Sequence, residues 1–124
     1  MLNSAPILVV EDEPYVALAL QATIEAAGGK VVRPVGSVSA ALALLETRAV
    51  AAAVLDVQLS DQDVTPVAIS LVSRGVPVVF QSAKPLPADL RQCCPDAVSY
   101  EKPVSAETLI ETLLNLTQSR PPSI

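Results

Sequence analysis

The chain of 124 residues contains no histidine and no tryptophan, and its aromatic residues number only three: Tyr15, Phe80 and Tyr100. Without histidine, the chain offers no Ser-His-Asp or Cys-His nucleophilic site, no histidine metal ligand and no phosphohistidine of its own. Acid–base chemistry near neutral pH would therefore need carboxylates, lysines or cysteines with shifted pKa values. Because aromatics are so few, the core must be built from Ala, Val, Leu and Ile.

Positive charge is also scarce. Charged residues make up 17% of the chain, against about 25% in ordinary soluble proteins. Thirteen acidic and eight basic residues give a net charge of −5, and the basic residues are spread from Lys30 to Arg120. No cluster among them could follow a phosphate backbone, so we expect no nucleic-acid partner.

Targeting and membrane signals are absent as well. The first basic residue is Lys30, so the start of the chain lacks the positive region of a signal peptide. The longest apolar run, residues 49–55, is too short to cross a bilayer. Cys93 and Cys94 are adjacent, which fits neither a metal-site spacing nor a disulfide framework and favours free thiols. We therefore expect a cytoplasmic protein.

Short apolar runs alternate with amphipathic stretches of helical period, which is typical of a parallel sheet covered by helices. The pattern predicts strands over 7–10, 31–35, 49–55, 76–80 and 97–100, and helices over 16–27, 38–45, 65–74, 88–92 and 105–116. Helix caps are expected from Ser37 or Ser39, from Thr65 and from Ser105, and a helix stop from the glycines at 28–29. The result is a (βα)₅ α/β domain with helices on both faces of the sheet.

Polar side chains recur where the predicted strands end: Glu11, Asp12, Asp56, Ser82 and Lys102. Ligands of open parallel sheets bind outside the carboxyl ends of the strands, where the strand order reverses. In the five-stranded order 2-1-3-4-5, which we take from known flavodoxin-like sheets, the first and third strands are neighbours. The three carboxylates should then converge.

Three converging carboxylates repel one another unless positive charge lies between them. Lys102 supplies one charge, and Mg²⁺ suits a small carboxylate site that also contacts a phosphoryl oxygen. A carboxylate can attack phosphorus to form an aspartyl phosphate. Such a transfer needs mainly positioning and charge stabilisation, which this site offers without histidine.

These residues resemble the response-regulator receiver domain over essentially the whole chain. The matching pieces are the acidic pair Glu11-Asp12, Asp56 after an apolar strand, Ser82-Ala83, and Lys102 before a proline. The run at 77–84 is similar to the P-F-x-F-A-T-G-Y stretch of alphaproteobacterial single-domain receivers. The resemblance implies one receiver domain over 1–120, with a disordered tail at 121–124.

The resemblance also implies roles for individual residues. Asp56 would accept a phosphoryl group from a kinase phosphohistidine, so the chain would catalyse its own phosphotransfer and dephosphorylation rather than act as a conventional enzyme. Lys102 would pair with the phosphoryl oxygens, and Ser82 and the Ala83 N–H would hydrogen-bond to them. The implied Mg²⁺ ligands are Glu11, Asp12, Asp56 and the backbone carbonyl of Gln58.

The implied partner is a sensor histidine kinase, for which the HWE/HisKA2 type is one candidate, and the implied output is contact with a downstream phosphotransfer or target protein. We expect a monomer or weak dimer without membrane contact. The candidate switch and interface residues are Ser82, Ala83, Lys84, Tyr100, Ile110 and Leu114. Many receivers have an aromatic residue three positions before the lysine, where this chain has Ser99. Tyr100 falls on the opposite strand face, which favours a surface or interface aromatic at least as much as a switch.

Two alternatives stay open at this point. The first is a pseudo-receiver that keeps the fold but acts as an interaction module without phosphorylation; Ser99 and the proline-rich loop at 84–87 favour it. The second is a small flavin binder of flavodoxin-like fold. The acidic sequence after the first strand disfavours it, because Glu11, Asp12 and Glu13 would repel a flavin phosphate.

Overall fold

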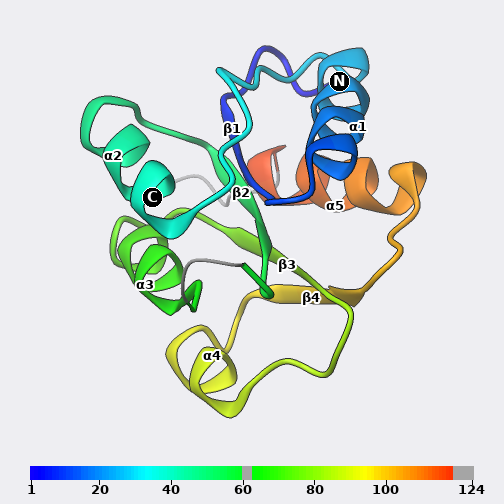
Figure 1. Ribbon diagram of the computed structural model, residues 1–124. Coiled ribbons are helices and arrows are strands. Elements are labelled where there is room, and N and C mark those ends of the chain that lie inside the picture. The colour runs from blue at the N-terminus through cyan, green and yellow to red at the C-terminus, as the bar shows by residue number, and fades with distance from the viewer. Residues whose placement is uncertain (60–62, 119–124) are drawn as a thin grey trace, which may run out of the picture.

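The computed structural model describes residues 1–59 and 63–118, and shows an α/β fold with a parallel four-stranded sheet and five helices (Figure 1). The strands, in the sheet order β1-β2-β3-β4, are β1 (Ile7–Val10), β2 (Ala52–Asp56), β3 (Val78–Ser82) and β4 (Val98–Glu101). The helices are α1 (Pro14–Ala26), α2 (Val38–Thr47), α3 (Thr65–Ser73), α4 (Ala88–Cys93) and α5 (Ala106–Gln118). The predicted tail at 121–124 lies outside the described residues.

The helices cover both faces of the sheet, as predicted. Figure 1 shows α1 and α5 on one face and α2 and α3 on the other, with α4 beside α3. Side chains alternate between these faces along each strand: Leu8 and Val10 pack toward α2 and α3, whereas Ile7 and Val9 pack toward α1 and α5. Both faces are buried, which explains why the strands read as continuous apolar runs. Within the described ranges, no helix is both long and apolar enough to cross a membrane.

The predicted strand at 31–35 does not form, so the expected five-stranded order 2-1-3-4-5 is wrong in this detail. The segment lies beside β1 but makes only two isolated bridges, Pro6 with Lys30 and Val10 with Val35. The sequence separation between the two bridged residues is one larger at the second bridge than at the first. Between the two bridges, the segment therefore has one residue more than β1. If the segment kept the register of the first bridge, a Pro34 N–H would have to donate to the Val9 carbonyl. Proline has no N–H, so this bond cannot form. Val35 donates instead, at 3.0 Å, and the ladder is interrupted.

The later strands begin later and end later than predicted. Asp56 and Ser82 are the last residues of β2 and β3, beyond the predicted strand ends at 55 and 80. Asp56 pairs with Gln81 in the ladder, and Ser82 pairs with Glu101. Backbone hydrogen bonds do not depend on side-chain polarity, so apolar runs underestimate how far a strand continues. As a result, the polar side chains are held by regular strand geometry.

Two of the three predicted helix caps are confirmed. Ser37 Oγ accepts a hydrogen bond from the Ala40 N–H at 3.1 Å, and Ser105 Oγ accepts one from the Thr108 N–H at 3.1 Å. The cap predicted from Thr65 is wrong, because Thr65 is already the first helical residue. Instead, the Asp63 carboxylate accepts a hydrogen bond from the Thr65 N–H. A cap at Thr65 would have accepted from N–H groups further along the helix.

Candidate functional site

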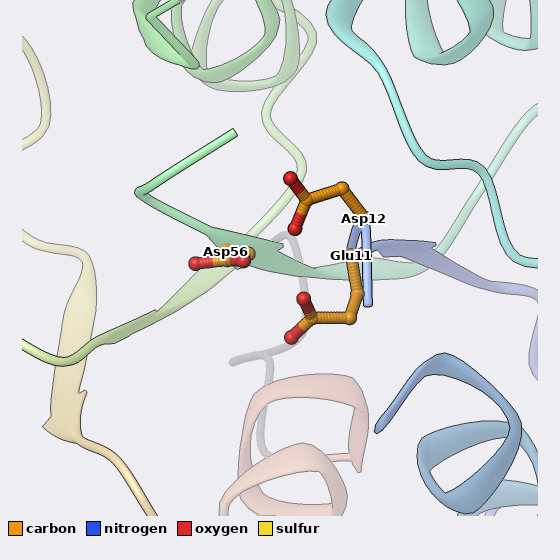
Figure 2. A group of neighbouring side chains, drawn as sticks. All are labelled: Glu11, Asp12 and Asp56. Atoms are coloured by element: carbon orange, nitrogen blue, oxygen red, sulfur yellow. The ribbon is translucent and has the colours of Figure 1, made fainter. Parts of the chain in front are cut away.

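Three carboxylates meet at the carboxyl ends of the first two strands. Figure 2 shows Glu11 and Asp12 leaving the chain after β1 in opposite directions, with Asp56 beside them at the end of β2. One carboxylate oxygen from each residue lies within 4.8 Å of the others. Glu11 and Asp56 are each only 2% exposed, whereas Asp12 is half-buried. The pairing of β1 with β2 brings these residues together, as the sequence predicted.

Lys102 supplies the positive charge at this cluster. It follows β4, and its Nζ lies 2.9 Å from Glu11 Oε1 and 3.3 Å from Asp56 Oδ2. The backbone holds Lys102 in place, since its N–H donates to the Ser82 carbonyl at 2.8 Å. One ammonium group against three carboxylates leaves a local excess of negative charge. The site therefore favours a further cation.

The carboxylates carry shifted pKa values. The pKa of Asp56 is raised to about 6: burial is the largest cause, a hydrogen bond with Glu11 and the charge of Glu11 act in the same direction, and the Gln58 N–H and Lys102 act against them. Burial also acts to raise the pKa of Glu11, but hydrogen bonds with Lys102, Asp56 and the Glu13 N–H outweigh it, so the net shift is downward. Glu11 is therefore the more acidic member of the pair, and Asp56 holds a proton more readily.

Burial acts to lower the pKa of Lys102, but its hydrogen bond to Glu11 and the charges of Asp56 and Glu11 raise it overall. The ammonium form is therefore favoured. Two backbone N–H groups also orient the carboxylates: Glu13 donates to Glu11 Oε2 and Gln58 donates to Asp56 Oδ1, both at 3.1 Å. The site is thus fixed by the main chain before any ligand binds.

A second polar cluster surrounds the end of β3. Ser82 Oγ accepts from the side-chain amide of Gln58 at 2.8 Å, and Gln58 Oε1 accepts from the Ala83 N–H at 3.1 Å. Lys84 contributes its backbone groups to Ser82, while its side chain is exposed. Sequence reasoning missed the Gln58 side chain, because nothing local in the sequence indicates a contact with residues 24 and 25 positions further along.

Tyr100 is half-buried on the sheet face that α5 covers, and its hydroxyl lies 2.6 Å from Thr112 Oγ1. Tyr100 and Ser99 lie on opposite strand faces, as predicted, but Ser99 is the exposed residue. The interpretation of Tyr100 as a surface aromatic is wrong, because its side chain packs against the core under α5. The predicted interface candidates Ile110 and Leu114 are less exposed than an apolar contact surface requires. Both side chains are half-buried and pack against the core between the sheet, α1 and α5, which leaves them only partly available to a partner.

Gln81 is a buried polar residue that sequence reasoning missed. It pairs with Asp56 in the strand ladder and is 4% exposed. Its Nε2 has no hydrogen-bond partner among the described residues. With Lys102, Gln81 lines a cavity of about 320 Å³ between α1 and α5, next to the carboxylates. Gln81 directly follows the apolar run at 76–80, which is the signal that could have drawn attention to it.

The chain is similar to proteins of known structure. No protein-family model matches the chain, and no curated protein matches it either. Solved structures do match over nearly the whole length. SdrG from Sphingomonas melonis Fr1 is 32% identical, with a TM-score of 0.77 over 94% of this chain and 98% of that one.

Two further matching structures are those of receiver proteins. A response regulator receiver protein from Sinorhizobium medicae WSM419 is 26% identical, with a TM-score of 0.79 over 98% of this chain and 100% of that one. The receiver domain of the sensor histidine kinase PA1611 from Pseudomonas aeruginosa PAO1, with magnesium coordinated in its active site cleft, is 22% identical. Its TM-score is 0.78 over 92% of this chain and 98% of that one. The chain therefore has the response-regulator receiver fold.

Proposed function

From the receiver fold and the chemistry of its strand ends, we propose that this chain is a response regulator of a two-component phosphorelay. Asp56 accepts a phosphoryl group from a sensor histidine kinase. The observation that carries the proposal is the position of the Asp56 carboxylate: it lies at a strand end, 3.3 Å from Lys102 Nζ and beside two further carboxylates. Similarity to receiver structures supports the same role.

The donor set fits Mg²⁺. Three carboxylates with one ammonium group between them leave negative charge uncompensated, and small divalent cations prefer such oxygen ligands. Glu11, Asp12 and Asp56 would hold the ion together with the backbone carbonyl of Gln58. When bound, Mg²⁺ supplies charge that stabilises the oxygens of a transferring phosphoryl group. The magnesium in the active site cleft of the PA1611 receiver domain supports this assignment.

The chain's own residues then perform the transfer. A carboxylate oxygen of Asp56 attacks phosphorus, forming an O–P bond while the N–P bond of the kinase phosphohistidine breaks and its electron pair stays on the imidazole. Lys102 stays beside the acceptor and pairs with the phosphoryl oxygens. Ser82 Oγ and the Ala83 N–H provide donors on the other side. Water later hydrolyses the acyl phosphate, so the domain serves as both acceptor and catalyst.

The output of this domain is a protein contact, either with an onward phosphotransfer protein or with a target. The role places the chain in the cytoplasm, where a sensor kinase carries its phosphohistidine. A narrower placement, among alphaproteobacterial single-domain receivers with a kinase of the HWE/HisKA2 type, rests on the run at residues 77–84. The half-buried residues Ile110 and Leu114 can contribute only an edge of such an interface.

Incubation with a small phosphodonor and Mg²⁺, followed by intact-protein mass spectrometry, tests the proposal. We expect the wild type to gain the mass of one phosphoryl group and Asp56→Asn to gain none. Asp96→Asn, which changes an exposed aspartate outside the carboxylate cluster, is the matched control and should behave as the wild type. No gain in the wild type, with either a phosphodonor or a cognate kinase, would contradict the proposal.

The alternative function is an interaction module that works without phosphorylation. One observation favours it: Ser99 stands where many receivers have their mobile aromatic, while the Tyr100 hydroxyl is bonded to Thr112. The usual aromatic relay is therefore replaced or missing. The same mass measurement separates the two functions, because the alternative predicts no phosphoryl gain in the wild type. It also predicts that Asp56→Asn still binds its partner.

A further inference from the structure

The side chain of Gln58 occupies the donor and acceptor groups at the end of β3. Its Oε1 accepts from the Ala83 N–H at 3.1 Å, and its Nε2 donates to Ser82 Oγ at 2.8 Å. A backbone N–H can only donate, so the amide atom facing Ala83 must be the oxygen. The opposite amide atom is then the nitrogen, which can only donate to Ser82. The orientation of the amide is therefore fixed by the main chain.

The hydroxyl of Ser82 can form no further hydrogen bond. It accepts from Gln58 and from the Lys84 N–H at 3.1 Å, and its single proton goes to the Lys84 carbonyl at 2.5 Å. A serine hydroxyl has one proton and two lone pairs, so all are in use. The Ala83 N–H is likewise taken. Neither group can donate to a new oxygen ligand until the present bonds break.

We propose that Gln58 is a latch in the unmodified state: its Oε1 competes with a phosphoryl group on Asp56 for the Ala83 N–H, and its Nε2 holds the Ser82 hydroxyl in the orientation that donates to Lys84. The inference rests on the proposed function and adds to it a positioning residue that sets how readily the site accepts its ligand. Because Oε1 of Gln58 sits on the Ala83 N–H, it stands in for the phosphoryl oxygen that this N–H would otherwise bind.

The position of Gln58 suits a latch that senses Asp56. Its own N–H donates to Asp56 Oδ1 at 3.1 Å, so the backbone of one residue touches the acceptor while its side chain touches the loop after β3. Gln58 is exposed, so water can solvate its amide once it is displaced. Release therefore costs the two direct hydrogen bonds but leaves no buried polar group unsatisfied.

Gln58→Met tests the latch, since methionine has similar length and no amide. In the unmodified protein we expect hydrogen exchange of the Ala83 N–H to speed up by about 3- to 10-fold, the effect of losing one net hydrogen bond. Beryllofluoride with Mg²⁺, a phosphoryl mimic, should bind about 3- to 10-fold more tightly, because no latch has to open. Gln92→Met, an exposed glutamine in α4, should change neither value.

Gln58→Glu provides a second variant. Its carboxylate still accepts from the Ala83 N–H but cannot donate to Ser82, so Ala83 exchange should stay close to the wild-type rate. Unchanged Ala83 exchange and unchanged or weaker beryllofluoride affinity in Gln58→Met would overturn the latch. If wild-type protein binds no beryllofluoride, the proposed function fails and the latch fails with it. Normal wild-type binding combined with an unaltered Gln58→Met contradicts the latch alone.

Discussion

The ammonium nitrogen of Lys102 lies 3.3 Å from a carboxylate oxygen of Asp56, although β3 lies between β2, which ends at Asp56, and β4, which ends just before Lys102. The same nitrogen lies 2.9 Å from Glu11, which follows β1 at the far side of the sheet. One side chain therefore links the end of the last strand to the ends of the first two. Local stability and the proposed chemistry both depend on this link.

Removing the charge of Lys102 should destabilise the fold. In Lys102→Met, Glu11 and Asp56 stay buried at pH 7 without their ammonium partner. Breaking a fully buried pair costs about 3–5 kcal/mol, and because Lys102 is partly exposed we expect about 1–3 kcal/mol. Denaturant unfolding measures the loss. Lys84→Met removes an exposed ammonium group and should change the free energy of unfolding little; an equal loss in both variants would contradict the account.

The raised pKa of Asp56 predicts a specific pH dependence in metal-free protein. Its folded pKa of about 6 exceeds the usual value of 3.8, so the folded state binds the proton more tightly. The contribution of Asp56 to stability is present below about pH 4 and is lost as the pH rises through about 6.

At pH 7 the folded wild type must keep the buried Asp56 carboxylate ionised, which costs free energy, and Asp56→Asn removes this cost. At pH 7 it should therefore unfold with a free energy about 1–2 kcal/mol higher than the wild type, and the difference should shrink toward pH 4. Denaturant unfolding at several pH values, with a chelator present, provides the measurement. A difference that stays constant from pH 4 to 7 would exclude Asp56 as its cause.

Magnesium should stabilise the protein through the three carboxylates. A cation that binds only the folded state adds about 1.4 kcal/mol at ten times its dissociation constant. Thermal unfolding with and without Mg²⁺ should show this stabilisation in the wild type and a much smaller one in Asp12→Asn. Asp89→Asn, in the first turn of α4, leaves the carboxylate cluster intact and should respond as the wild type does. Equal responses of the two variants would argue against the site.

The hydrogen bond between Tyr100 and Thr112 should tie β4 to α5. Tyr100→Phe and Thr112→Val should each lower the free energy of unfolding by about 0.5–1.5 kcal/mol, and the double variant should lose less than the sum. Tyr15→Phe serves as control because Tyr15 is 84% exposed and should show no change. Strict additivity in the double variant would mean that the two hydroxyls do not interact.

The residue pattern was sufficient to predict most of the fold. Continuous apolar runs indicated strands buried on both faces, and the strand ends indicated where Glu11, Asp56 and Lys102 would meet. The segment at 31–35 shows the limit of this reasoning. Its valines suit a strand, but the missing N–H of Pro34 interrupts pairing with β1, and only the register reveals this.

The contacts of the site were less predictable than its location. The Gln58 side chain reaches Ser82 and Ala83 across a loop, and such a long-range hydrogen bond has no periodicity that a sequence could show. Gln81 was missed for a different reason. It follows an apolar run, and burial of an amide beside Asp56 depends on how α1 and α5 cover that face.

The central claim is that the carboxylate of Asp56 is the phosphoryl acceptor, and chemical trapping tests it most directly. After phosphotransfer from a phosphorylated kinase in the presence of Mg²⁺, borohydride reduces an acyl phosphate to the corresponding alcohol, which converts an aspartyl phosphate to homoserine. Peptide mass spectrometry should then find homoserine at position 56 and unmodified aspartate at positions 12 and 63. Homoserine at another position, or none anywhere after incubation with an active kinase, would contradict the claim.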